Sequence, residues 1–170
     1  LPAAVVPVVV GAVICNGLGG AHWSRAVLAL IVSLLLQIGV NYANDYSDGV
    51  RGTDKVRVGP MRLVASGVAS PQSVKAAAFI AFGAAAGVGM VLALMTSLWV
   101  IPVGFAALLA GWFYTGGKNP YGYIGLGEIF VFVFFGLVAT VGTTYVVIER
   151  IPFMSWLQGV AVGSLACALL

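Results

Sequence analysis

The chain has 170 residues, of which 61% are hydrophobic and 8% are charged, whereas a soluble domain carries roughly 25% charged residues. So few charged side chains cannot cover a water-soluble globule, and the sequence therefore predicts an all-α, polytopic membrane protein whose outer surface contacts the lipid bilayer. The net charge of +3 comes from basic residues in loops between apolar segments. Membrane topology explains this pattern, which does not indicate binding to nucleic acid.

Six apolar segments are predicted as membrane-spanning helices, each of which needs about 20 residues. The uncharged stretch 76–117 is about twice the length of one crossing, so it is predicted to be a hairpin of two helices with a turn near Thr96, Ser97 and Pro102. The predicted spans are 1–22, 26–48, 71–95, 98–116, 127–148 and 152–170. Because the first span starts and the last span stops abruptly, we expect the chain to be part of a larger protein.

A polar loop, 49–69, separates the second and third spans. It is rich in cations, because five of the eight basic residues lie in it or beside it: Arg51, Lys55, Arg57, Arg62 and Lys75. The positive-inside rule therefore places this loop in the cytoplasm. The alternation of spans then places Lys118, after the fourth span, on the same side.

The third span has a defined start and a row of small residues. Ser70 is suited to cap a helix and Pro71 to occupy its first position, so the helix is predicted to start there. Gly83, Gly87 and Gly89 recur along the span with alanines between them, which permits a neighbouring helix to approach closely.

The end of the second span carries a cluster of polar residues. Asn41, Asn44, Asp45 and Asp48 are spaced i, i+3, i+4 and i+7, so on a helix they project from one face. An unpaired carboxylate costs on the order of 2.5 to 3.5 kcal/mol at the centre of a bilayer, and like charges one turn apart repel, so we expect a cation between them. Oxygen ligands without Cys or His favour a hard cation such as Mg²⁺.

The loop that follows adds the carboxylate of Asp54 and the cations Lys55, Arg57 and Arg62 among glycines, which let a backbone approach a ligand. Acid-bound Mg²⁺ facing fixed cations is the arrangement that a diphosphate requires. The alternative is a salt-bridge cluster in which Arg51, Lys55 or Arg57 neutralises the acids.

A second polar patch, WFYTGGKNPYGYIGLGE, follows the fourth span on the same predicted side and contains Tyr114 and Lys118. Glu128 begins the fifth span, and an acid at the membrane boundary usually faces a cavity or a partner. The alternatives are that Lys118 is an ordinary interfacial anchor and that Glu128 pairs with it or reaches water.

These motifs carry a resemblance. Asn44-Asp45-x-x-Asp48, the basic loop and Tyr114-x-x-x-Lys118 resemble the UbiA superfamily of membrane prenyltransferases. The segments NYANDYSDGVRGTD, VGPMRLVASG, WFYTGGKNPYGYIGLGE and EIFVFVFFGLVATVGTTY look like the 1,4-dihydroxy-2-naphthoate polyprenyltransferases of menaquinone biosynthesis, and the likeness covers essentially the whole chain.

The resemblance implies a nine-span helical bundle in the cell membrane, with about six spans in this chain and an active site on the cytoplasmic side. The implied reaction moves a polyprenyl group from its diphosphate to 1,4-dihydroxy-2-naphthoate with decarboxylation, giving demethylmenaquinone, with Mg²⁺ as cofactor. A second acidic motif of the family is missing from this chain, so we expect these 170 residues to be inactive alone.

Residue roles follow from the same resemblance together with the pattern above. The implied catalytic residues are Asp45, Asp48, Tyr114 and Lys118. The implied metal ligands are Asn44, Asp45, Asp48 and Asp54. In ubiquinone-type relatives a further acid stands four residues after the second Asp, but that position is Gly52 here, and the next acid is Asp54. The implied substrate-binding residues are Asn41, Lys55, Arg57, Arg62 and Glu128.

Other functions stay open at this point. A related transferase could use another aromatic acceptor, such as 4-hydroxybenzoate. A phosphatidyl-type transferase also uses an Asp-rich helix, but only Asp48-Gly49-Val50-Arg51 matches the beginning of its motif. A cation-coupled secondary transporter could use the polar face of the second span as an ion site, which it would need near the membrane midplane.

Overall fold

The computed structural model describes residues 1–53 and 61–170, and within those ranges the chain forms helices and turns without a β-strand. The elements are α1 (Pro2–Ile14), α2 (Trp23–Arg51), α3 (Pro71–Met95), α4 (Val100–Phe113), the 3-10 helix η2 (Tyr121–Ile124), α5 (Gly127–Val131), the π-helix η3 (Phe132–Val138), α6 (Ala139–Ile148) and α7 (Phe153–Ala168). The last turn of α5 continues through η3 into α6, so these three form one long helix. The predicted all-α class is confirmed.

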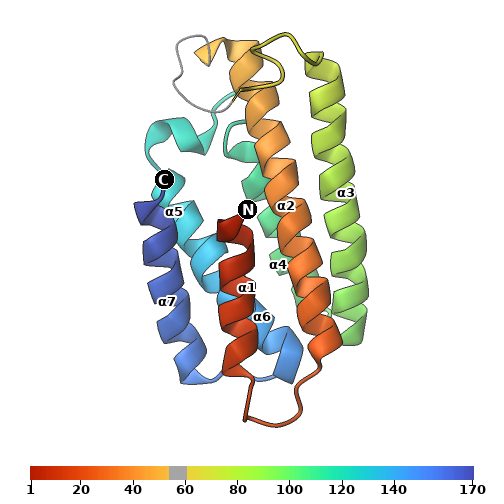
Figure 1. Cartoon of the computed structure of the whole chain (residues 1–170), viewed down its shortest axis with the longest axis vertical. Coiled ribbons are helices and arrows are strands. Elements are labelled where there is room, and N and C mark those ends of the chain that lie inside the picture. The colour runs from red at the N-terminus through yellow and green to blue at the C-terminus, as the bar shows by residue number, and fades with distance from the viewer. Residues whose placement is uncertain (54–60) are drawn as a thin grey trace.

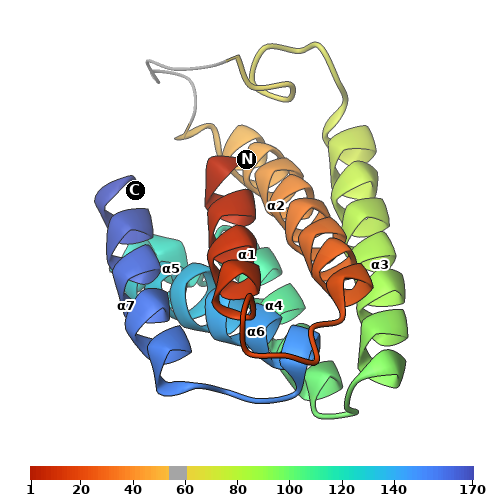
Figure 2. The ribbon, with the colours of Figure 1, turned by 60° about the horizontal axis from the view of Figure 1, so that its bottom comes forward.

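The helices lie side by side, and the chain passes back and forth between two ends of the bundle (Figures 1 and 2). We call the end that holds residues 61–70, residues 114–126 and the C-terminal turns of α2 the upper end, as it appears in Figure 1. The turns 15–22, 96–99 and 149–152 lie at the opposite, lower end. Residues 61–69 and Lys118 thus lie at the same end, while the side of the membrane that this end faces stays a prediction.

Among the residues that the structure describes, three helices are long and apolar enough to cross a membrane: Trp23–Arg51, Pro71–Met95 and Gly127–Ile148. The other three apolar helices, α1, α4 and α7, have 13, 14 and 16 residues. The helix in the first predicted span ends at Ile14 rather than near residue 22, because Gly17, Gly19 and Gly20 adopt positive φ angles that a right-handed helix does not contain.

The turn between α3 and α4 is made by residues 96–99 alone. The Thr96 hydroxyl donates to the carbonyl oxygen of Leu92 at 2.7 Å and closes the last turn of α3. Pro102 lies in the first turn of α4 rather than in the connection, because a proline is tolerated where a helix has not yet begun to use its N–H groups.

The start of α3 is confirmed, whereas the close approach that its glycines permit is not seen among the described residues. The Ser70 hydroxyl oxygen accepts the N–H of Ser73 at 3.2 Å, and Pro71 is the first helical residue. Gly83, Gly87 and Gly89, however, have no atom within 4 Å of the position that a Cβ would occupy. Within the described residues, therefore, no neighbouring helix makes use of their small size.

Close helix contacts occur at other glycines instead. A Cβ at Gly39 of α2 would lie 2.6 Å from the ring of Phe82 on α3. A Cβ at Gly136 of η3 would lie 2.5 Å from the Cα atom of Gly163 on α7. These glycines let α2 pack against α3, and η3 against α7, at distances that a larger residue would not permit.

The packing of α2 against α3 fixes the direction of its polar face. Ala43 is fully buried together with Ala78 and Phe82 of α3. Because Gly39 and Ala43 face α3, Asn44 and Asp48 are turned away from α3, toward the segment that connects α4 and α5. The upper half of α2 therefore presents Asn44 and Asp48 to the inside of the upper end.

Candidate functional site

The carboxylate of Asp45 fastens the loop that precedes α3. It is 6% exposed, and its two oxygens accept the backbone N–H groups of Leu63 at 2.9 Å and Val64 at 3.0 Å. Successive residues of a helix are rotated by about 100°, so Asp45 points to this loop while Asn44 points elsewhere. The two hydrogen bonds hold the loop against α2 directly beside Arg62.

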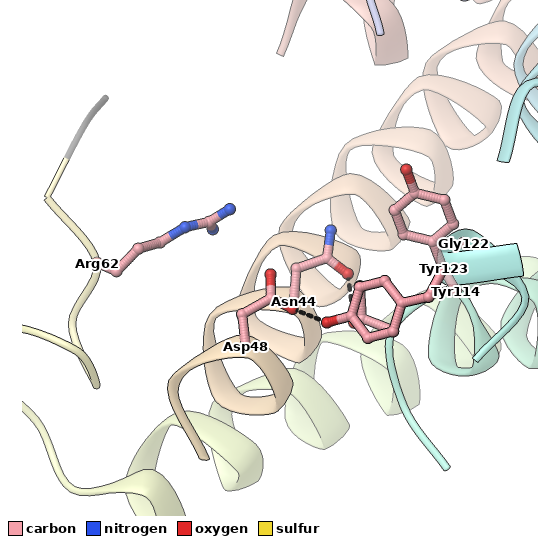
Figure 3. Close-up of a pocket in the computed structure, with 7 residues that line it drawn as sticks. Asn44, Asp48, Arg62, Tyr114, Gly122 and Tyr123 are labelled. Carbon is pink, nitrogen blue, oxygen red and sulfur yellow. Dashed lines mark hydrogen bonds between the residues drawn. The ribbon is translucent and has the colours of Figure 1, made fainter. Parts of the chain in front are cut away.

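Arg62 faces a cavity of about 220 Å³ at the upper end of the bundle. Its lining comes from α2, from the loop before α3 and from the α4–α5 connection: Asn44, Asp48, Arg62, Tyr114, Thr115, Gly122 and Tyr123. Figure 3 shows the guanidinium of Arg62 pointing toward Asn44 and Asp48, with Tyr114 and Tyr123 on the other side of the pair. The fold thus gathers two oxygen-bearing side chains, a cation and two phenols from distant parts of the sequence.

The connection between α4 and α5 is tied to the polar face of α2 by two hydroxyl groups. The Thr115 hydroxyl donates to the Asn44 side-chain oxygen Oδ1 at 2.7 Å. The Tyr123 hydroxyl donates to Oδ1 of Asp48 (Figure 3). Each of the two α2 side chains in the cavity therefore accepts a hydrogen bond from this connection.

The side chain of Arg51, in the last turn of α2, binds backbone oxygens of the same connection. Its guanidinium donates to the carbonyl oxygens of Thr115 and Gly117, the latter at 2.5 Å, and lies 5.3 Å from the ring centroid of Tyr123. Both carbonyl groups lie just beyond the end of α4 at Phe113, so Arg51 ties the start of the connection to α2. Arg51 is thus committed to backbone oxygens, and the predicted alternative that it neutralises the acids receives no support from these contacts.

The Tyr123 phenol is held in its protonated form. Tyr123 is 49% exposed; partial desolvation, and then the hydrogen bond to Asp48, raise its pKa above the ordinary value of 10.0. The phenol therefore acts as a donor to the carboxylate at neutral pH.

The second tyrosine of η2 is bonded differently. The Tyr121 hydroxyl donates to the Ala110 carbonyl oxygen of α4 at 2.7 Å. Its ring meets Tyr114 edge-on at 5.6 Å and stacks on Phe130 at 3.9 Å between ring centroids. These contacts fix η2 against α4 and α5 without involving α2.

The remaining predicted residues lie around the cavity or outside the described ranges. Asn41 is exposed, one turn below Asn44 on α2. Lys118 is exposed on the connection that lines the cavity, and Glu128 is exposed in the first turn of α5. Asp54, Lys55 and Arg57 fall in residues 54–60, outside the described residues.

The chemistry of the cavity fits a hard cation. The side-chain oxygens of Asn44 and Asp48 are the ligands that Mg²⁺ accepts, and Mg²⁺ takes one or two carboxylates together with waters and phosphate oxygens. Within residues 1–53 and 61–170, no group of three or more His, Cys, Asp or Glu side chains is placed to hold a metal ion. The described residues therefore offer a partial, oxygen-only ligand set that a phosphate-bearing ligand would complete.

Sequence reasoning missed the contacts of Arg51 with the backbone of the α4–α5 connection, and missed Thr115 and Tyr123 as partners of the polar face. Thr115 and Tyr123 are 71 and 75 residues away from the side chains that they contact. The helical repeat shows which residues share a face of one helix, but not which distant segment packs against that face. The available signal was their place in the polar patch after the fourth span, WFYTGGKNPYGYIGLGE, which also contains the predicted site residue Tyr114.

Comparison with known proteins gives a consistent result. The model of the UbiA prenyltransferase family matches residues 4–170. The chain is 51% identical over 170 residues to the 1,4-dihydroxy-2-naphthoate octaprenyltransferase of Mycobacterium tuberculosis, a match that covers 100% of this chain and 58% of that protein. It is 37% identical over 177 residues to the protein of the same name from Escherichia coli, again covering 100% of this chain and 58% of the relative.

A more distant relative of the same name, from Bacillus subtilis, is 26% identical over 170 residues, with 99% of this chain and 55% of the relative covered. The chain thus spans somewhat more than half the length of these relatives. No solved structure matches it. Since the family model covers nearly every residue, the chain belongs to the UbiA prenyltransferase family.

Proposed function

We propose that this chain carries the diphosphate site of a membrane prenyltransferase that acts on 1,4-dihydroxy-2-naphthoate in menaquinone biosynthesis. The observation that carries the proposal is the cavity in which Asn44 and Asp48 face Arg62 at one end of an apolar bundle. The names of the relatives support the acceptor and the polyprenyl donor. The family supports the reaction class.

In the proposed reaction, the C–O bond of the polyprenyl diphosphate breaks and its electron pair leaves with the diphosphate. A C–C bond forms between the allylic carbon and the naphthoate ring, and the carboxylate leaves as carbon dioxide. The developing charge on the leaving diphosphate is what the site must stabilise, because only interactions that strengthen in the transition state accelerate the chemical step.

Asn44 and Asp48 would hold Mg²⁺ through their side-chain oxygens. Bound there, the ion would neutralise diphosphate oxygens and assist departure of the leaving group. Arg62 faces the same cavity, and its planar guanidinium can bind phosphate oxygens in pairs. Tyr114 lines the cavity beside them and would contact the donor near the reacting bond.

Asp45 and the flanking residues complete the proposed site. The contacts of Asp45 support a role in positioning the Arg62 loop, while direct ligation of a metal stays a prediction. Lys118 is kept as a diphosphate contact because it lies on the connection that lines the cavity. We retain Asp54, Lys55 and Arg57 as metal or diphosphate residues, and Asn41 and Glu128 as acceptor residues, on the sequence pattern alone.

The isoprenoid tail would extend from the cavity along the apolar helices. Phe130 of α5 and Phe134 of η3 lie one turn apart with ring centroids 6.1 Å from each other, which offers an apolar wall in the direction of the lower end. The protein would be a multi-pass protein of the cell membrane, with the upper end in the cytoplasm, where the basic loop places it.

The position of the cavity favours a transferase over an ion-coupled transporter. Asp48 lies three residues before the end of the 29-residue helix α2, whereas a coupling ion is bound near the midplane of the membrane. An end position suits an enzyme whose donor has a charged head and an apolar tail.

The test is a product assay with the full-length protein in lipid nanodiscs, with 1,4-dihydroxy-2-naphthoate or 4-hydroxybenzoate as acceptor and with or without Mg²⁺. We expect prenylated, decarboxylated naphthoate only with Mg²⁺. Faster prenylation of 4-hydroxybenzoate would overturn the acceptor assignment, and turnover in the presence of a chelator would overturn the metal requirement.

A further inference from the structure

The connection between α4 and α5 contains three hydroxyl groups with described partners, and they divide into two kinds. Tyr121 donates to the backbone of α4, as expected for a group that stabilises the fold. Thr115 and Tyr123 instead donate to Asn44 and Asp48, the two side chains of α2 that face the cavity. Packing of the connection against α2 does not by itself require hydrogen bonds from its hydroxyl groups to these two side chains.

We infer that Thr115 and Tyr123 are positioning residues for the metal-binding pair Asn44 and Asp48. The inference rests on the proposed function, since it assigns a role to residues around the same cavity. A donor on one side-chain oxygen fixes the plane of the amide or carboxylate, while the remaining lone pairs stay available to a cation. Ligating carboxylates are commonly oriented in this way by groups that do not touch the metal.

Arg51 makes this arrangement reciprocal. The same helix, α2, supplies Asn44 and Asp48 and also grips the carbonyl oxygens of Thr115 and Gly117. Thr115 is 4% exposed, and Arg51 restrains the backbone around it, so the Thr115 hydroxyl has little freedom to move away from Asn44. The α4–α5 connection is therefore held by α2 and in turn orients the ligands of α2.

The test measures binding of Mn²⁺, as a paramagnetic substitute for Mg²⁺, to the full-length protein in nanodiscs without substrate. The electron paramagnetic resonance signal of free Mn²⁺ gives the dissociation constant. Tyr123→Phe removes the hydroxyl bonded to Asp48, and Tyr121→Phe is the matched control, because it removes a hydroxyl of the same helix that bonds elsewhere. We expect Tyr123→Phe to weaken binding roughly 10- to 100-fold, and Tyr121→Phe to leave it unchanged.

A second pair of variants decides the question if Tyr123→Phe fails to fold. Thr115→Val keeps the shape of the buried side chain but removes its hydroxyl, whereas Thr115→Ser restores the donor. We expect Val to weaken Mn²⁺ binding and Ser to rescue it. Equal losses for Val and Ser, or equal effects of the two Tyr variants, would overturn the inference.

The same measurement separates this inference from the proposed function. If the parent protein binds no Mn²⁺ either alone or after addition of methylene diphosphonate, an unreactive source of phosphate-like oxygens, the proposed metal site fails and takes the inference with it. If the parent binds Mn²⁺ and Tyr123→Phe and Thr115→Val bind it equally well, only the positioning roles fail. At saturating Mg²⁺, we expect both variants to keep the KM of the parent for farnesyl diphosphate, which a misfolded site would not do.

Discussion

The two ends of the bundle use their charged residues in different ways. At the lower end, Arg25 pairs with Glu149 at 2.5 Å, and Arg150 donates to the Leu18 carbonyl oxygen at 3.1 Å. At the upper end, Asp45 accepts hydrogen bonds from two backbone N–H groups, and Asp48 accepts one from the Tyr123 hydroxyl. A neutral donor orients a carboxylate without cancelling its charge, so an acid held in this way can still attract a cation.

The largest expected effect comes from Asp48→Asn, which keeps the size of the side chain and removes its charge. Because Asp48 would stabilise the cation that assists the leaving group, we expect the rate of prenyl transfer to fall on the order of 10²- to 10³-fold. The measurement is the rate at saturating substrates with the full-length protein. Glu149→Gln, at the lower end, is the control for loss of one acid, and equal rates for the two variants would contradict the account.

Asp45→Ala is expected to act next most strongly, through the loop that it fastens. The change removes the partners of two backbone N–H groups, and hydrogen bonds to charged groups are worth about 1.5 to 3 kcal/mol each. We expect faster hydrogen exchange at Leu63 and Val64 and a higher KM for prenyl diphosphate, because Arg62 is displaced.

Asp45→Asn sharpens this expectation. The amide keeps one carbonyl oxygen and so retains one of the two acceptors, which predicts an intermediate KM with an unchanged dependence on Mg²⁺ concentration. A shift in that dependence as large as the shift caused by Asp48→Asn would show that Asp45 is a direct metal ligand, contrary to the role that its contacts support.

A smaller effect is expected from adding a methyl group where helices touch. In Gly136→Ala, the new Cβ would lie 2.5 Å from the backbone of Gly163, so η3 and α7 must separate. We expect a loss of about 1 to 3 kcal/mol in stability, measured by thermal unfolding in nanodiscs. Gly83→Ala is the control, since no atom of residues 1–53 and 61–170 lies within 4 Å of its Cβ position, and a helical alanine is favoured by about 0.5 to 1 kcal/mol. Equal destabilisation by both variants would contradict this packing.

The smallest effect is expected from Glu149→Gln itself. The Arg25 side chain is 11% exposed and that of Glu149 is 52% exposed, and ion pairs of this kind contribute at most about 1 kcal/mol. Thermal unfolding at low and high salt should show a small difference that salt reduces further. A change in transfer rate would mean that the lower end takes part in the reaction.

Sequence periodicity predicted part of the polar face, because Asn44 and Asp48 lie one turn apart on one helix. The spacing of Asn44 and Asp48 places both in the cavity, as a 3.6-residue repeat requires. Asp45 was grouped with them, yet its contacts turn it toward the loop before α3. Adjacent residues differ by about 100° around a helix. The packing of the whole chain decides that Asn44 contacts the α4–α5 connection and Asp45 the loop before α3.

The role of the glycines was harder to predict. Gly83 and Gly87 are one turn apart, as in a contact row, yet they and Gly89 have no described atom near their Cβ positions, whereas Gly39 and Gly136 make the close contacts. A small residue permits a close approach without requiring one, and the partner helix is not visible in the local sequence. The contacts of Thr115 and Tyr123 escaped prediction for the same reason, because they join segments distant in the chain.

The most direct test of the central claim is the binding of farnesyl diphosphate to the full-length protein, by calorimetry, with Mg²⁺ and with a chelator. The account predicts binding by the parent protein and by Glu149→Gln only when Mg²⁺ is present, and loss of that binding in Asp48→Asn. Equal binding with the chelator, or retention of Mg²⁺-dependent binding by Asp48→Asn, would contradict the assignment of this cavity.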